Sequence, residues 1–146
     1  MSADGEFRVP QGWEPVGSSI NSDYYRVKPH LVVVRPHPGS LDGAESAQSN
    51  VDFQLDYART QGRVCGFVIM LGQLNSQDAG ARRVYATEMD PELCMGCALV
   101  INSPIARAIG SFFIGLARPR IRLKLVDTVE AGIEWLESID TSGGSK

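Results

Sequence analysis

The fold class is decided by one stretch of the chain, Cys97-Ala98-Leu99-Val100-Ile101-Asn102-Ser103-Pro104-Ile105. Its first five residues are continuously apolar, which is typical of a strand that is covered on both faces. Ser103 and Pro104 then predict a helix start, because the serine hydroxyl can cap free amides and proline suits the first turn. Apolar residues continue at helical spacing as far as Leu116, so this part of the chain predicts a β-α unit.

The same pattern recurs on the N-terminal side. Apolar runs at residues 31–34 and 65–71 predict two more buried strands. Each run is followed by a helix whose apolar residues lie three or four positions apart. The first of these helices ends at Gly62, which we expect to be its C-cap, and the second begins at Ser76, which we expect to be its N-cap.

Alternating residues mark the outer elements of the predicted sheet. Residues 24–28 alternate weakly, as a half-exposed edge strand does, and Pro29-His30 predicts a tight turn into the next strand. Residues 120–125 alternate basic and apolar side chains, which is typical of an edge strand protected by charge against unwanted pairing. Residues 127–130 predict a capping box, and a last helix follows as far as Ile139.

The resulting order is β-β-α-β-α-β-α-β-α, which predicts a single α/β domain with a small mixed, mostly parallel sheet. Residues 32–34, 67–69 and 99–101 are expected to be inner strands, with residues 120–124 at an edge. A length of 146 residues suits one domain. We expect an irregular N-terminal arm over residues 1–23, the domain over residues 24–140 and a flexible tail over residues 141–146.

Composition narrows the classes of function. A net charge of −3 argues against a general nucleic-acid partner, because such binding rests on neutralising phosphates. No apolar run approaches the roughly 20 residues that a membrane span needs, and the first residues are too polar for a signal peptide. Three cysteines do not make a disulfide scaffold. The sequence therefore predicts a cytoplasmic protein.

Three arrangements that could carry chemistry have simpler explanations. Cys94 and Cys97 form a CxxC pair, but at the start of a strand a spacing of three should turn the two thiols to opposite faces. Ser76 and His37 could form a triad with Asp42 or Asp78, yet no nucleophile elbow surrounds the serine. Phosphate-loop motifs are absent from the sequence. We therefore expect no catalytic residue, no metal site and no cofactor.

Several local patterns resemble the free-standing bacterial branch of the STAS-like (SpoIIAA-like) domains, the fold of the anti-sigma-factor antagonists. The matching stretches are Gly39-Ser40-Leu41-Asp42 before a helix, Leu71-Gly72-Gln73-Leu74-Asn75-Ser76 before the next, Asn102-Ser103-Pro104-Ile105-Ala106-Arg107, and Val129-Glu130-Ala131-Gly132-Ile133-Glu134-Trp135-Leu136. Members that are phosphorylated carry an Asp-Ser pair where this chain has Asn75-Ser76.

The resemblance implies a non-enzymatic regulatory module that binds a protein partner around the helix expected to start at Ser76, with Ser76 as a phosphorylation site. It is also compatible with a homodimer. Free amides at the two helix starts attract anions, unless the serines cap them. The partner- or anion-binding residues that we expect are Gln73, Asn75, Ser76, Arg82, Asn102, Ser103 and Arg107. The alternative function is a small-ligand or lipid-binding domain that uses the crevice at the carboxyl ends of the strands.

Overall fold

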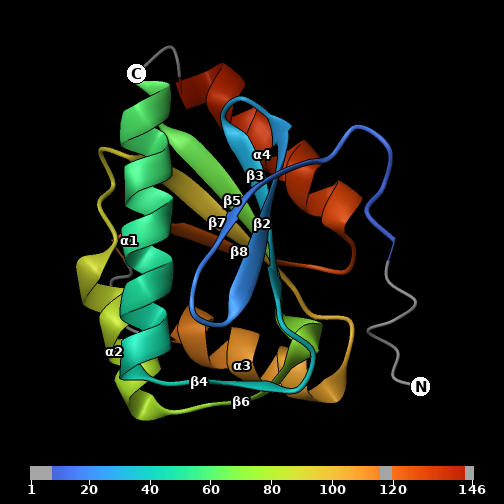
Figure 1. Cartoon of the computed structure of the whole chain (residues 1–146), viewed down its shortest axis with the longest axis vertical. Coiled ribbons are helices and arrows are strands. Elements are labelled where there is room, and N and C mark those ends of the chain that lie inside the picture. The colour runs from blue at the N-terminus through green and yellow to red at the C-terminus, as the bar shows by residue number, and fades with distance from the viewer. Residues whose placement is uncertain (1–7, 116–119, 144–146) are drawn as a thin grey trace.

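The centre of the structure is a mixed sheet with the strand order β1-β2-β3-β5-β7-β8 (Figure 1). The computed structural model describes residues 8–115 and 120–143, with side chains for 8–111 and 120–139. Strands β3, β5, β7 and β8 run parallel, whereas β1 pairs with β2 and β2 with β3 in antiparallel fashion. The strands span Glu14–Ser18 (β1), Ser22–Lys28 (β2), Leu31–Pro36 (β3), Cys65–Met70 (β5), Cys94–Val100 (β7) and Arg122–Val126 (β8).

Helices cover both faces of this sheet. In the described part of the chain they are α1 (Ala44–Gln61), α2 (Ala79–Glu88), α3 (Pro104–Gly115) and α4 (Val129–Gly143). The core between the sheet and α1, α2 and α3 contains Val32 and Val34, whereas Leu31 and Val33 face α4. Figure 1 shows α1 and α4 on opposite sides of the sheet. Because β3 is covered on both faces, its apolar residues need no alternation.

The structure is therefore a single small α/β domain with a mostly parallel mixed sheet. The inner positions of β3, β5 and β7 confirm the prediction from the apolar runs, and β8 lies at the predicted edge. Two predicted helix ends are also confirmed. Gly62 closes α1 in the left-handed conformation with φ of 70°, and the Ser103 hydroxyl accepts a hydrogen bond from the Ala106 amide at 3.1 Å.

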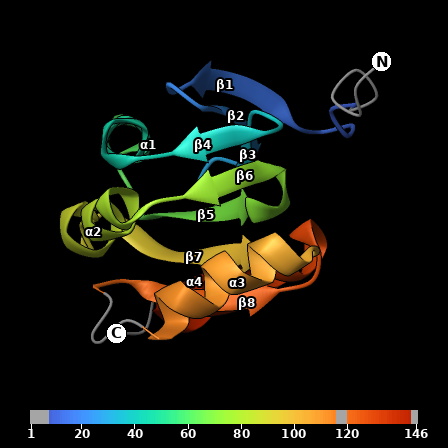
Figure 2. The ribbon, with the colours of Figure 1, turned by 90° about the horizontal axis from the view of Figure 1, so that it is seen from below.

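A second, two-stranded parallel sheet was not predicted. It consists of β4 (Ser40–Asp42) and β6 (Leu74–Gln77), and a short 3-10 turn, Leu71–Gln73 (η2), leads into β6. Figure 2 views the end of the molecule where this small sheet lies beside α3, beyond the carboxyl ends of β3, β5 and β7. Strands of three and four residues are too short to show a period of two in the sequence.

The expected helix start at Ser76 is wrong. Ser76 belongs to β6, and α2 begins at Ala79 after the N-cap Asp78. The Asp78 carboxylate accepts a hydrogen bond from the Ala81 amide at 2.9 Å. Asp and Ser are comparably good N-caps, so the two candidates could not be separated by residue type alone. At α4 the cap is Thr128, whose hydroxyl accepts from the Ala131 amide at 3.1 Å.

The chain ends also differ from expectation. Residues 1–23 were expected to be irregular, yet Glu14–Ser18 form the edge strand β1. A bulge at Val16 and the exposure of most β1 side chains hide the alternation that marks a strand. At the other end α4 continues to Gly143, three residues into the expected tail. None of the described helices is both long and apolar enough to cross a membrane.

Cys94 and Cys97 lie on the same face of β7, contrary to the prediction of opposite faces. The register Cys65↔Cys94 followed by Gly66↔Gly96 places an extra residue, Met95, in β7. This bulge reverses the alternation, so both thiols enter the core beside α1 and α2. A hydrogen bond with Cys97 and then burial raise the pKa of Cys94, and burial raises the pKa of Cys65 to about 11. The Cys94 and Cys65 thiols are therefore protonated at neutral pH.

Replacing Gly17 tests whether β1 is an integral part of the fold. Gly17 has φ of 146°, and an added Cβ would lie 2.6 Å from the Phe53 ring. We expect Gly17→Ala to lower the free energy of unfolding by about 2–4 kcal/mol through strain and overpacking. Gly12→Ala is the control, because its φ is also positive, at 94°, but no atom lies within 4 Å of the added Cβ. Equal losses in the two variants, measured by urea denaturation, would contradict this packing of β1.

Replacing Cys94 and Cys97 tests whether these two thiols have only a packing role. We expect replacement of Cys94 and Cys97 by serine to preserve the fold, with the free energy of unfolding lowered by about 1–3 kcal/mol because two hydroxyls enter an apolar site. The circular dichroism spectrum should be retained, and a chelator should leave the melting temperature of the wild type unchanged. Release of a metal ion on chelation, with a fall in the melting temperature of the wild type, would show that the thiols form a working centre.

Candidate functional site

The residues expected at the first helix start lie in different environments. Asn75 and Ser76 are exposed on β6, and Gln73 lies in η2, where its side-chain oxygen accepts a hydrogen bond from Arg35 at 3.4 Å. Arg82 lies on α2, and its Nη1 donates to the Gln77 carbonyl at 2.8 Å. Asn75 and Ser76 are therefore both open to solvent, while the Arg82 guanidinium is engaged with the backbone of β6.

The residues expected at the second helix start stay together. Asn102, Ser103 and Arg107 line an open depression with Asp127 at the start of α3. The Asn102 side chain also packs against η2, because a Cβ added at Gly72 would lie 2.4 Å from its Oδ1. The turn that contains Gln73 thus adjoins this depression. Since the Ser103 hydroxyl already accepts from a helix amide, serine self-capping is the arrangement found there.

The small β4–β6 sheet has two different faces. Its register pairs Leu41 with Ser76 and Asp42 with Gln77. Leu41 is 64% exposed and Ser76 is exposed with it, so this pair forms the outer face. Asp42 is only 4% exposed, and its carboxylate accepts from the Gln77 amide at 3.1 Å on the inner face. The sheet therefore separates a solvent-facing surface from a buried polar site.

The buried site is centred on the Asp42 carboxylate. Oδ1 accepts from the Ser46 hydroxyl at 2.6 Å and from the Asn21 side-chain amide at 3.4 Å. Oδ2 accepts from the Tyr85 hydroxyl at 2.8 Å and from the Gln77 side-chain amide at 3.1 Å. We call these five residues the Asp42 cluster. Its members come from the β1–β2 turn, β4, α1, β6 and α2, so one carboxylate joins five separate segments of the chain.

A second set of polar side chains continues the cluster beneath α1. The Asn50 side-chain oxygen accepts from the Tyr24 hydroxyl at 2.7 Å and from the Ser19 hydroxyl at 2.6 Å. Its amide nitrogen donates to the Asn21 side-chain oxygen at 2.9 Å, and Gln54 donates to the Tyr24 hydroxyl at 3.1 Å. The Asp42 cluster is therefore held in place by buried hydrogen bonds.

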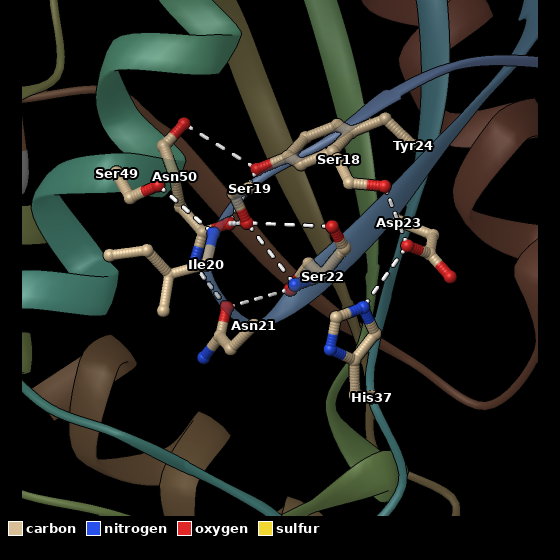
Figure 3. Close-up of polar contacts among 10 residues, drawn as sticks. All are labelled: Ser18, Ser19, Ile20, Asn21, Ser22, Asp23, Tyr24, His37, Ser49 and Asn50. Atoms are coloured by element: carbon tan, nitrogen blue, oxygen red, sulfur yellow. Dashed lines mark hydrogen bonds and ion pairs between the residues drawn. The ribbon is translucent and has the colours of Figure 1, made fainter.

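Figure 3 shows how the β1–β2 turn is fixed to α1. The Ile20 amide donates to the Ser49 hydroxyl at 3.1 Å. His37, a candidate member of the triad considered above, lies 3.0 Å from Asp23 Oδ1. Burial alone would raise the pKa of Asp23, but hydrogen bonds with Ser18 and His37 outweigh it and leave that pKa below its usual value. His37, which follows β3, is thus a partner of Asp23 near the start of β2.

The hydroxyls of Tyr24 and Tyr85 are hydrogen-bond donors in this network. Burial, the charge of Asp42 and the hydrogen bond to it together raise the pKa of Tyr85 well above its usual value. Burial likewise raises the pKa of Tyr24, although the hydrogen bond from Gln54 opposes the shift. Both hydroxyls therefore keep their protons at neutral pH, and Tyr85 donates to Asp42 permanently.

A cavity of about 70 Å³ adjoins the Asp42 cluster. Its remaining walls are mostly apolar side chains of β3, β5, η2, β6, α2, β7 and the start of β8: Val34, Ile69, Leu71, Leu74, Met89, Leu99, Ile121 and Leu123. Cys97 and Ala86 also line it, and Arg120 lies at its edge. Apolar walls beside a few fixed polar groups are the usual composition of a small-molecule site.

The Asp42 cluster was not predicted as a site, although the sequence carries a signal for part of it. Ser46, Asn50 and Gln54 are spaced by four residues, which places them on one side of α1. All three are buried beside the apolar positions Val51 and Ala58. Polar residues at this spacing on the inner side of a helix indicate a buried hydrogen-bond network.

The geometry offers hydrogen bonding and apolar packing. No group of three or more metal-ligating side chains occurs among the residues that the structure describes.

Among curated proteins the sequence has no significant match. Residues 32–140 match the family model described as a domain of unknown function, DUF7793, and this segment contains most of the Asp42 cluster. Because the match covers well over half of its residues, the chain belongs to the DUF7793 family.

Proposed function

We propose that the protein is a non-enzymatic regulatory module that binds a protein partner through the outer face of β4–β6 and the start of α3. The observation that carries the proposal is Leu41, which is 64% exposed beside its register partner Ser76. A strand that buries Asp42 on its inner face does not need a large apolar residue on its outer face for folding. Its exposure is typical of a contact residue for another protein.

Neighbouring side chains extend this surface. Ile20 is 56% exposed in the β1–β2 turn, and the adjacent Asn21 donates to the Leu41 carbonyl at 3.4 Å. Ile105 is 48% exposed near the start of α3, the helix that packs against β6. Asn75 and Asn102 supply hydrogen-bonding groups near these apolar residues. The partner should therefore present an apolar patch with polar groups at its rim.

The resemblance to STAS-like domains supports the same surface. In that family a serine after the matching strand meets the partner, and its phosphorylation controls the contact. Ser76 is exposed, as a modification site must be. A phosphate there would gain little from the amides of α2, because Ser76 belongs to β6 and the Asp78 carboxylate lies at that helix start and already accepts from the Ala81 amide. It would instead add about −1.5 to −2 of charge to the outer face and weaken an apolar contact.

The test compares two surface variants with a control at the other end of the sheet. The assay measures how much partner protein the immobilised chain captures from a cell lysate. We expect Leu41→Glu and Ser76→Asp to reduce this amount about tenfold or more, with melting temperatures within about 2 °C of the wild type. Val64→Glu is the matched control, because Val64 is 39% exposed and precedes the opposite end of β5. It should leave capture unchanged.

Two results would contradict the proposal. One is capture that survives Leu41→Glu as well as it survives Val64→Glu. The other is a wild-type homodimer, seen by analytical ultracentrifugation, that Leu41→Glu dissociates, since the surface would then bind a second copy of this chain. Each variant is assayed as the 146-residue chain for both melting and capture.

A further inference from the structure

The cavity beside the Asp42 cluster lies on the inner side of β4–β6, away from the proposed partner surface. Asp42, Leu74 and Gln77 belong to its wall, whereas Leu41 and Ser76 do not. The volume of about 70 Å³ is roughly half that of a cavity that takes benzene, so it has room for about three carbon atoms. A ligand of this site is therefore a small molecule or a short chain.

The inner end of the cavity does not select a charged ligand. Both oxygens of the Asp42 carboxylate already accept two hydrogen bonds each, from Ser46 and Asn21 and from Tyr85 and Gln77. The Tyr85 hydroxyl also accepts from the Asn50 amide at 3.0 Å. The negative charge of Asp42 disfavours an anion at this end, and the apolar walls favour a hydrocarbon chain.

The outer edge of the cavity carries a positive charge. Among the lining residues that the structure describes, Arg120 is the exposed one, so it marks where the cavity meets solvent. Its Nη1 donates to the Thr87 carbonyl at the end of α2 at 2.8 Å, which holds the guanidinium beside that helix. The other donors of the guanidinium are available to a carboxylate in the bidentate geometry that arginine favours.

We propose that the cavity binds a short aliphatic carboxylate of about four carbons, with its three-carbon chain among Ile69, Leu99 and Met89 and its carboxylate at the Arg120 guanidinium. This placement satisfies the three constraints together. The volume limits the chain, the apolar walls cover it, and the opposite charges of Asp42 and Arg120 orient it. The proposal goes beyond the partner-binding role and does not depend on it.

The experiment is isothermal titration of the 146-residue chain with butanoate and with 1-butanol. We expect saturable binding of both, with butanoate bound roughly tenfold more tightly because its carboxylate pairs with Arg120. Arg120→Gln should remove that advantage and leave 1-butanol binding unchanged. Arg122→Gln is the matched control, since Arg122 is exposed on β8 and does not line the cavity, and it should change neither.

A cavity-filling variant locates the site. Ala86 lines the cavity from α2, so Ala86→Leu should abolish binding of both compounds, whereas Ala79→Leu at an exposed position of α2 should not. In the wild type, nuclear Overhauser contacts should join the butanoate chain to the Met89 methyl group, and this measurement requires no variant to fold. Absence of saturable butanoate binding, absence of these contacts, or equal butanoate affinities in the wild type and Arg120→Gln would overturn the proposal.

Discussion

Four hydrogen bonds to one buried carboxylate hold this end of the molecule together. Asp42 is 4% exposed, and an ionised carboxylate in such a place is stable only when donors replace the lost water. Those donors come from the β1–β2 turn, α1, β6 and α2. Each hydrogen bond to a charged group contributes about 1.5–3 kcal/mol, which is enough to fix short segments that cannot hold themselves. The β4–β6 sheet, with strands of three and four residues, is such a segment.

Because side chains alternate along a strand, the buried position of Asp42 determines both faces of the β4–β6 sheet. With Asp42 and Gln77 fixed inward, Leu41 and Ser76 must point outward, because successive side chains lie on opposite faces. The inner residues complete a cavity with apolar walls, and the outer residues complete the surface that we propose for a partner. A one-residue change of register would exchange the two sets. The hydrogen bonds of Asp42 therefore determine which side chains a partner can reach.

The sequence contains enough information for the main sheet but not for this end of it. The apolar runs of β3, β5 and β7 and the glycine at Gly62 have a single physical interpretation, and both agree with the structure. By contrast, the sequence leaves two interpretations of the α2 cap, Ser76 and Asp78. The choice between them depends on hydrogen bonds from residues far away in the chain. The bulge at Met95, which brings Cys94 and Cys97 to one face, likewise follows from pairing with β5 and leaves no local signal. Asp42 itself looks like an ordinary loop residue until Ser46 and Tyr85 are placed beside it.

The most direct test of the central role of Asp42 is a double-mutant cycle of Asp42→Asn and Tyr85→Phe, with free energies of unfolding from urea denaturation. Asparagine keeps one acceptor oxygen and has an NH2 group in place of the other, so two of the four donors lose their acceptor and Asp42→Asn alone should lose about 2–4 kcal/mol. If Tyr85 acts through the carboxylate, the double variant should lose less than the sum of the single losses, with a coupling energy of about 1–2 kcal/mol. Losses that add to within about 0.3 kcal/mol would contradict the account, because the two side chains would then stabilise the fold independently.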